Sequence, residues 1–123
     1  MTKIKLSVVL ATYNEEENIR DCLSSVKNIA DEIIIVDGSS KDQTRDISES
    51  FGAKVVKTQN HTNFHINKQK AIEKASGEWI LQLDADERVT LGLAKEIKQI
   101  IRMSDAEVDK HQSELKNRKL FLR

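Results

Sequence analysis

The chain has 123 residues, enough for one domain with a single core. Its 20 basic and 20 acidic residues give a formal net charge of zero, so attraction to nucleic acid or to an anionic membrane surface is not predicted. The one cysteine, Cys22, excludes an internal disulfide and suits a reducing compartment, and no segment approaches the length of a membrane span.

Apolar runs and amphipathic segments alternate four times along the chain. The run from Ile33 to Val36 is apolar on both faces, which favours a central strand of a parallel sheet. The same reasoning predicts strands at 4–11, 33–36, 53–57 and 78–83, and helices at 14–29, 42–51, 66–75 and 90–101. Strand–helix order repeated in this way predicts an α/β domain with a mainly parallel sheet and right-handed crossovers.

Polar residues mark the expected helix starts. Asn14 is predicted to cap the first helix with Glu17 as its capping-box partner. Asp42 and Thr90 are predicted to cap the second and fourth helices. Such caps supply acceptors for the backbone N–H groups that have no partner inside the helix.

The composition changes after residue 103. Most residues from Ser104 to Lys119 are charged or polar, so a helix restarted at Ser104 would bury little and is expected to be solvated or frayed. Leu120 to Leu122 is predicted to open a further strand. We therefore expect a first unit over residues 1–103, then a polar helical tail with an incomplete strand over 104–123. We also expect a truncated domain, the first part of a longer protein.

Two acids, Asp84 and Asp86, directly follow the fourth predicted strand. Residues i and i+2 of an extended segment point to the same side, so the two carboxylates repel one another unless a cation lies between them. A hard divalent cation that binds carboxylate and phosphate oxygens together meets that need. An ordinary acidic turn is the alternative interpretation of the pair.

Polar clusters also follow the first two predicted strands, at Thr12 to Glu15 and at Asp37 to Ser40. Ligands of open α/β sheets bind beyond the carboxyl ends of the strands. Three polar clusters at this one edge predict a single binding site. Taken singly, Tyr13 could pack over the sheet edge, Asn14 could cap its helix, and Asp37 with its glycine could form a turn.

Three segments together resemble the family 2 glycosyltransferases of the GT-A fold. They run from Val8 to Glu16, from Ile35 to Thr44 and from Ala75 to Glu87, in the order and spacing of that family. The stretch from Asn63 to Ala75, with Asn67-Lys68-Gln69-Lys70, is similar to the subgroup that adds sugars to lipopolysaccharide core. The resemblance covers about the first hundred residues and implies a GT-A fold, a Rossmann-like three-layer sandwich.

The resemblance implies roles for five residues at the nucleoside. Ala11, Thr12 and Tyr13 would line the nucleotide base, with Tyr13 stacked on it or flanking it. Glu15 would lie near the ribose or the base. Asp37 would form a hydrogen bond with the base edge, usually that of uracil.

Three further roles are implied at the phosphates. Lys68 stands where members often carry a basic residue near the diphosphate. Asp84 would contact the ribose or sugar, and Asp86, together with Asp84, would form the site of a Mg²⁺ or Mn²⁺ ion that bridges the diphosphate. Such an ion acts as a Lewis acid on the negative charge that develops when the sugar–phosphate bond breaks.

The implied function is transfer of a sugar from a nucleotide-diphosphate donor, a UDP-sugar, to a saccharide or lipid-linked acceptor in cell-envelope polysaccharide synthesis. The implied location is the cytoplasm, and peripheral association with the inner face of the membrane through a later part of the protein stays open. The family's general base, an acid in the later half of the domain, is not identifiable. Asp105, Glu107 and Asp109 are acids of the tail, and nothing in the sequence places them beside an acceptor.

Three other interpretations fit parts of the sequence. A nucleotide-sugar-binding module, or an inactive fragment without transferase activity, would also lack the base. A phosphorylated receiver domain shares the α/β pattern but needs an acid pair after its first strand, where Tyr13 and Asn14 stand. His61 and His65 have the spacing of a zinc pair, but no cysteine or third histidine lies near them in sequence, so solvated loop histidines are the better interpretation.

Overall fold

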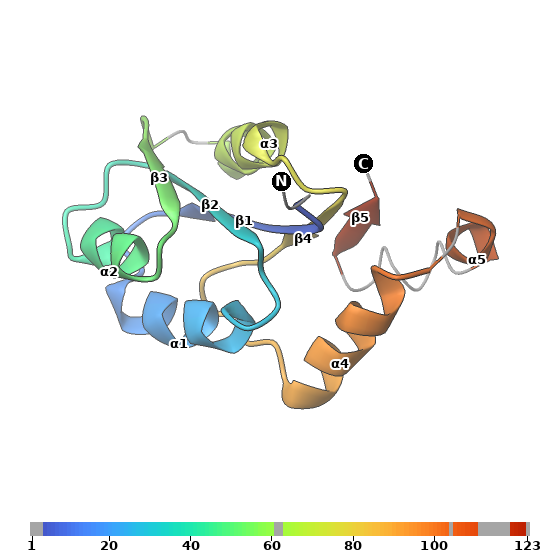
Figure 1. Cartoon of the computed structure of the whole chain (residues 1–123). Helices are drawn as coiled ribbons and strands as arrows, with labels where there is room; N and C mark the ends of the chain where they lie inside the picture. Colours follow the sequence, from blue (N-terminus) through green and yellow to red (C-terminus); the bar gives the residue numbers. More distant parts are fainter. Residues whose placement is uncertain (1–3, 61–62, 104, 111–118, 123) are drawn as a thin grey trace.

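The described residues form five strands in one sheet (Figure 1). The computed structural model describes residues 4–60, 63–103, 105–110 and 119–122. The strands are β1 (Leu6–Thr12), β2 (Glu32–Asp37), β3 (Lys54–Lys57), β4 (Trp79–Gln82) and β5 (Leu120–Leu122). Their order is β3-β2-β1-β4-β5, and all neighbours are parallel except β4 and β5, which are antiparallel. The predicted α/β class with a mainly parallel sheet is confirmed.

Helices cover both faces of this sheet. They are α1 (Glu16–Val26), α2 (Thr44–Ser50), α3 (Phe64–Lys74), α4 (Leu91–Ile100) and α5 (Asp105–Lys110). Helix α3 lies on one face, and α1, α2 and α4 lie on the other (Figure 1), which gives the expected three layers. Within the described part of the chain, no helix combines the length and the apolar character needed to cross a bilayer.

The inner strand β2, between β1 and β3, is buried along its whole length, as predicted for a parallel strand with a helix on each face. Its side chains alternate between two apolar clusters. Ile33 and Ile35 join the larger cluster on the side of α1 and α4, and Ile34 and Val36 join the smaller one under α3. This alternation fixes the register of β2, because a shift of one residue would exchange the two faces.

The last described segments also contribute to the core. Val108 on α5 is 2% exposed and Leu120 on β5 is 1% exposed, and both belong to the larger apolar cluster. Val108 is the one described side chain of α5 that is buried, and those at 106, 107, 109 and 110 are exposed, so the helix buries little, as expected. The strand predicted at Leu120 to Leu122 is confirmed as β5.

Helix starts follow the predicted caps only in part. Thr90 caps α4 as predicted, since its Oγ1 accepts a hydrogen bond from the Leu93 N–H at 3.1 Å. Asn14 does not cap α1, whose N-cap is Glu15, without a side-chain hydrogen bond. Asn14 instead adopts a left-handed backbone, with φ of 52°, and its Oδ1 accepts from the Lys41 N–H at 2.8 Å.

Two other helix starts differ by one or two residues from the prediction. Helix α3 begins at Phe64, two residues before the expected start, because Asn63 caps it by accepting from the His65 N–H. Asp42 lies one residue before the N-cap of α2, and its carboxylate accepts from the Thr44 N–H at 3.0 Å. Asp42 thus serves the helix start from just outside the helix.

A buried carboxylate ties three strands and the loop before β4 together at the amino end of the sheet. Glu32 Oε1 accepts hydrogen bonds from Ser7 Oγ at 2.7 Å and from the Ser76 N–H at 2.8 Å, and Oε2 pairs with Lys54 at 3.2 Å. Ser7 Oγ in turn accepts from the Gly77 N–H, and a Cβ at Gly77 would lie 2.7 Å from that oxygen. Burial alone would raise the pKa of Glu32, but the hydrogen bonds outweigh it and hold the pKa below the usual range.

A second buried carboxylate, Asp37, organises the carboxyl end of the sheet. Its Oδ1 accepts from the hydroxyls of Thr12 at 2.7 Å and Ser40 at 2.6 Å. Its Oδ2 accepts from the Ser40 N–H at 2.8 Å and from Arg45 at 2.9 Å. Asp37 is fully buried, and burial alone would raise its pKa, but these four donors lower it below its ordinary value.

We predict that Glu32→Gln lowers the free energy of unfolding by about 1–3 kcal/mol near neutral pH, because it removes a hydrogen-bonded buried charge. Since the folded-state pKa of Glu32 is depressed, the charged form stabilises the fold above the unfolded-state pKa of about 4.3. That contribution disappears as the pH falls through the folded-state pKa. Urea unfolding of wild type and variant at several pH values measures the difference. Glu49→Gln, at an exposed position, is the control, and an equal loss at all pH values would contradict the prediction.

We also predict that Asp37→Asn destabilises the protein without any ligand, by about 3 kcal/mol, because buried donors lose their charged acceptor. Urea unfolding followed by circular dichroism measures it. The matched control is Asp46→Asn on α2, where the carboxylate is exposed. Wild-type stability of Asp37→Asn would show that this carboxylate has no structural role.

Candidate functional site

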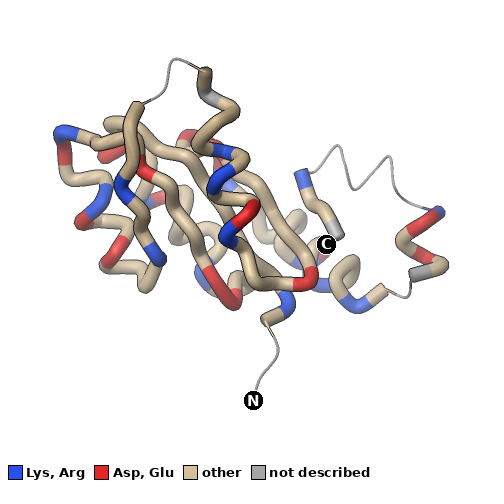
Figure 2. Tube along the Cα trace, turned by 90° about the horizontal axis from the view of Figure 1, so that it is seen from above, with Lys and Arg blue, Asp and Glu red and all other residues tan. Residues whose placement is uncertain are grey.

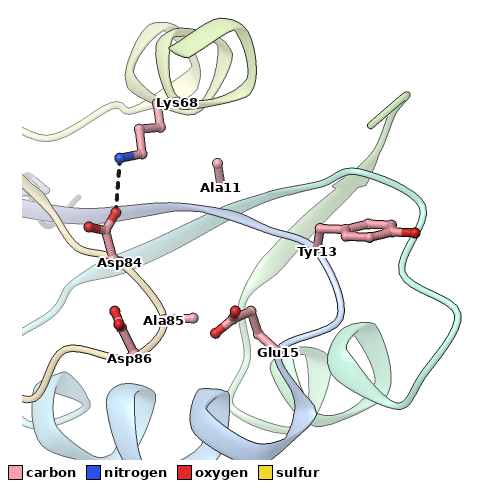
Figure 3. A pocket seen from close by; sticks show the side chains of 7 residues that line it. All are labelled: Ala11, Tyr13, Glu15, Lys68, Asp84, Ala85 and Asp86. Atoms are coloured by element: carbon pink, nitrogen blue, oxygen red, sulfur yellow. Dashed lines mark ion pairs between the residues drawn. The ribbon is translucent and has the colours of Figure 1, made fainter. Parts of the chain in front are cut away.

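A cavity of about 230 Å³ opens at the carboxyl end of the sheet (Figure 3). Residues from β1 and its following loop, from α3 and from the loop after β4 enclose it. They are Ala11, Tyr13, Glu15, Lys68, Asp84, Ala85 and Asp86. Figure 3 shows Lys68, Asp84 and Asp86 at one end and Tyr13 at the other, with Ala11 and Ala85 between them.

This position follows from the topology of the sheet. Thr12 pairs with Asp37 at the end of β1 and β2, and the Leu83 N–H bonds to the Val9 carbonyl just beyond β4. The loops that follow these parallel strands must therefore leave the sheet at the same edge. The expected convergence of polar segments at this edge is found in the geometry.

Asp84 is the most strongly paired acid of the cavity. Its Oδ1 lies 3.0 Å from Lys68 Nζ, and its Oδ2 lies 3.2 Å from Lys119 Nζ. Burial alone would raise the pKa of Asp84, but these two ammonium groups lower it below the usual range. Asp84 is therefore a carboxylate at neutral pH, and Asp86 is exposed beside it.

The residues from Asp84 to Glu87 form a closed turn, hereafter the acidic turn. The Glu87 N–H bonds to the Asp84 carbonyl at 2.9 Å, and Glu87 Oε1 accepts from the Asp84 N–H at 2.7 Å. Lys119 donates to the same Glu87 oxygen at 2.8 Å. Hydrogen bonds to Glu87 and Asp84 raise the pKa of Lys119 although partial burial acts in the opposite direction.

Helix α1 supports the acidic turn from below. The Cys22 thiol donates to the Asp84 carbonyl at 3.7 Å, and Ser25 Oγ accepts from the Val89 N–H at 3.0 Å. Burial raises the pKa of Cys22 to about 12, so its thiol stays protonated and can keep donating. These two hydrogen bonds thus join α1 to the first residue of the acidic turn and to Val89, two residues after its end.

The loop that carries Tyr13 and Glu15 is bound to the loop after β2. The Asn14 N–H donates to Ser40 Oγ at 2.8 Å, and the Glu15 N–H donates to Thr44 Oγ1 at 2.8 Å. These bonds hold the backbone on which both side chains depend. Figure 3 shows the Glu15 carboxylate directed toward Ala85.

Two of the residues predicted at the nucleoside do not line the cavity. Thr12 is buried, and its hydroxyl is committed to Asp37. Asp37 was expected to turn its carboxylate toward the ligand edge; in the structure its side chain is fully buried and surrounded by four internal donors. Its sequence position beside a turn gave no sign of Arg45, which reaches it from α2.

Lys119 was missed by sequence reasoning. It stands among polar residues of the tail, and only the antiparallel pairing of β5 with β4 brings it to the acidic turn. The only signal in the sequence for the position of Lys119 was the predicted strand from Leu120 to Leu122, which directly follows it. The three tail acids considered above lie on α5, which is not part of the cavity lining. They are Asp105, Glu107 and Asp109.

The residues present fit a divalent cation whose remaining ligands come from a bound substrate. Among the described residues, no group of three His, Cys, Asp or Glu side chains could hold a metal ion by itself. Asp84 and Asp86 offer hard oxygen ligands, and Mg²⁺ typically binds to one or two carboxylates together with substrate phosphates and water. Of the histidine pair considered for zinc, His61 lies outside the described residues, and His65 is exposed.

Charged residues of both signs are intermixed along the trace (Figure 2). The local arrangement at the acidic turn, rather than an overall field, therefore determines which ions the cavity attracts. Three acidic side chains, Asp84, Asp86 and Glu87, meet two lysines there. This arrangement suits a ligand that brings both a cation and negatively charged phosphates.

Comparisons with solved structures give the same fold. The crystal structure of residues 1–349 of S. aureus TarS matches with a TM-score of 0.65 and 28% identity, covering 89% of this chain and 33% of that chain. TarS has also been crystallised in complex with UDP. Glucosyl-3-phosphoglycerate synthase from Mycobacterium tuberculosis, in complex with Mn²⁺, UDP and glucosyl-3-phosphoglycerate, matches in fold with a TM-score of 0.59 and 23% identity, covering 69% of this chain and 36% of that chain.

Sequence relatives agree with the structural comparison. An uncharacterized glycosyltransferase from Rickettsia bellii (strain RML369-C) is 43% identical over 96 residues, which are 78% of this chain and 32% of the relative. The chain thus spans about a third of the length of that relative. The family model described as glycosyl transferase family 2 matches residues 7–119. The chain therefore belongs to glycosyl transferase family 2.

Proposed function

We propose that this chain binds a nucleotide-diphosphate sugar, with UDP as the nucleotide, and forms the donor-binding half of a glycosyltransferase. The observation that carries the proposal is one cavity that joins an aromatic residue, Tyr13, to a lysine and an acid pair. A base, a diphosphate and a cation are the three chemical groups that these residue types recognise. The UDP bound by TarS, a fold relative, supports the choice of nucleotide.

The proposed roles follow the layout of the cavity. The base lies at the end of Tyr13 and Ala11, with Glu15 near the ribose. Lys68 binds the diphosphate, and Asp84 contacts the ribose or sugar. Thr12 and Asp37 act from behind the cavity wall, where their hydrogen bond fixes the loops that carry the other residues.

The phosphate end would hold the divalent cation. Asp86, with Asp84 beside it, would bind Mg²⁺ or Mn²⁺, and the Mn²⁺ bound by glucosyl-3-phosphoglycerate synthase is consistent with that assignment. When bound, the cation supplies Lewis-acid stabilisation of the diphosphate oxygens. The exposed carboxylate of Asp86 has room for a ligand, whereas both Asp84 oxygens already face ammonium groups.

The chain's own residues then prepare the donor for transfer. Departure of the sugar leaves an additional negative charge on the diphosphate, and Lys68 is positioned to stabilise that charge. The alanines Ala11 and Ala85 keep the middle of the cavity open for the ribose and sugar. The acidic turn is held in place beforehand, so little rearrangement is needed when the donor binds.

The acceptor side rests on the sequence resemblance. We propose a saccharide or lipid-linked acceptor of the cell envelope, with the residues that line the donor cavity all within 1–103. A nucleotide-sugar-binding module without transferase activity is the second candidate. It is favoured because, among the described residues, each acid that lines the cavity (Glu15, Asp84 and Asp86) already has a proposed donor-binding role. Incubation with UDP-sugars and saccharide acceptors separates the two, because a module would bind donor without transferring sugar.

We predict that UDP binds at least about tenfold more tightly with Mn²⁺ or Mg²⁺ than with EDTA, a difference of about 1.4 kcal/mol. Asp86→Asn should remove most of this metal dependence, because it removes a charged oxygen ligand. Isothermal titration calorimetry measures both. The matched control is Asp46→Asn, far from the cavity on α2. Equal UDP affinity with and without metal would refute the assignment.

A second prediction concerns Lys68. Lys68→Met should weaken UDP binding about tenfold, the scale of one charge-assisted hydrogen bond, and should leave uridine binding unchanged. Comparing UDP with uridine separates contact with phosphate from a change in cavity shape. Lys74→Met, at an exposed position near the end of α3, is the control. Equal losses for UDP and uridine would show that Lys68 only shapes the cavity.

A further inference from the structure

Asp84 has a lysine at each carboxylate oxygen. Lys68 comes from α3 and lies 3.0 Å from Oδ1, and Lys119 precedes β5 and lies 3.2 Å from Oδ2. Two of the three negative charges of the acidic turn are thus already balanced from within the chain. A cation that approaches Asp84 meets the positive charge of both ammonium groups and competes with them for the carboxylate.

Lys119 contacts Glu87 as well as Asp84. It also donates to Glu87 at 2.8 Å, and the same Glu87 oxygen accepts from the Asp84 N–H at 2.7 Å. Lys119, Glu87 and Asp84 therefore form a closed ring of hydrogen bonds. The backbone of Lys119 is left-handed, with φ of 57°, and its carbonyl accepts from the Gln82 N–H, which fixes the lysine at the end of β4.

We propose that Lys119, together with Lys68, is a built-in counter-ion of Asp84 that makes cation binding depend on the nucleotide diphosphate. The proposal rests on the proposed function and adds Lys119 to that site as a positioning residue. The negatively charged diphosphate offers the lysines a new partner. The carboxylates of the acidic turn then become available to the cation.

Cation and nucleotide should therefore help one another to bind. Thermodynamic linkage requires the effect to be reciprocal: whatever factor UDP adds to Mn²⁺ affinity, Mn²⁺ adds to UDP affinity. Without a diphosphate, the lysines oppose the cation through both competition for Asp84 and charge repulsion. Lys119 is the better residue to test, because it does not line the cavity itself.

The experiment compares Mn²⁺ binding by wild type and Lys119→Met, with and without UDP, by calorimetry or by electron paramagnetic resonance of free Mn²⁺. We expect Lys119→Met to bind Mn²⁺ alone about five- to tenfold more tightly, because one positive charge near the cation is removed. The enhancement of Mn²⁺ binding by UDP should shrink by a similar factor. Lys119→Arg, which keeps the charge, should behave like wild type, and Lys110→Met on α5 is the control.

A merely structural role would give the opposite sign. Loss of the acidic turn would weaken Mn²⁺ binding both with and without UDP, so equal or weaker binding of Mn²⁺ alone by a folded Lys119→Met overturns the proposal. An arginine variant that behaves like the methionine variant also overturns it. If Lys119→Met does not fold, Lys68→Met provides the same comparison, with the same expected gain for Mn²⁺ alone. If wild type binds no UDP with Mn²⁺, the proposed function fails, whereas the measurement with Mn²⁺ alone still tests the counter-ion role.

Discussion

The parallel pairing of β1 with both β2 and β4 is the constraint on which the site depends. It sends three loops out of the sheet at the same edge, although the segments that form them are far apart in the chain. The apolar alternation of β2 secures this pairing by filling a core on each face. A cavity with contributions from β1, α3 and the acidic turn follows from that geometry and needs no further element.

Carboxylates serve two different purposes in this fold. Glu32 and Asp37 lie at opposite ends of β2, and each is buried and surrounded by donors that keep it charged. Asp84 and Asp86 lie in a turn with access to solvent and to the cavity. Burial, rather than place after a strand, distinguishes the supporting acids Glu32 and Asp37 from Asp84 and Asp86, which line the cavity.

Local pattern was sufficient to predict the strands, most helices and the edge where polar residues meet. It also singled out Tyr13, Asp84 and Asp86, and the family resemblance added Lys68; all four lie around one cavity. The enclosed state of Asp37 could not be predicted, because it depends on an arginine that reaches it across a loop. Lys119 was hidden for a similar reason: its partners lie on another strand, and antiparallel pairing of a three-residue strand has little sequence signal.

The thiol of Cys22 offers a way to measure how often the contact between α1 and the acidic turn opens. Only the thiolate reacts with alkylating reagents, and a buried group with a pKa of about 12 provides almost none of it while α1 and the acidic turn stay together. Labelling can proceed only through transient opening of that contact. The rate at which Cys22 is labelled therefore reports how often the contact between α1 and the acidic turn opens, without any ligand.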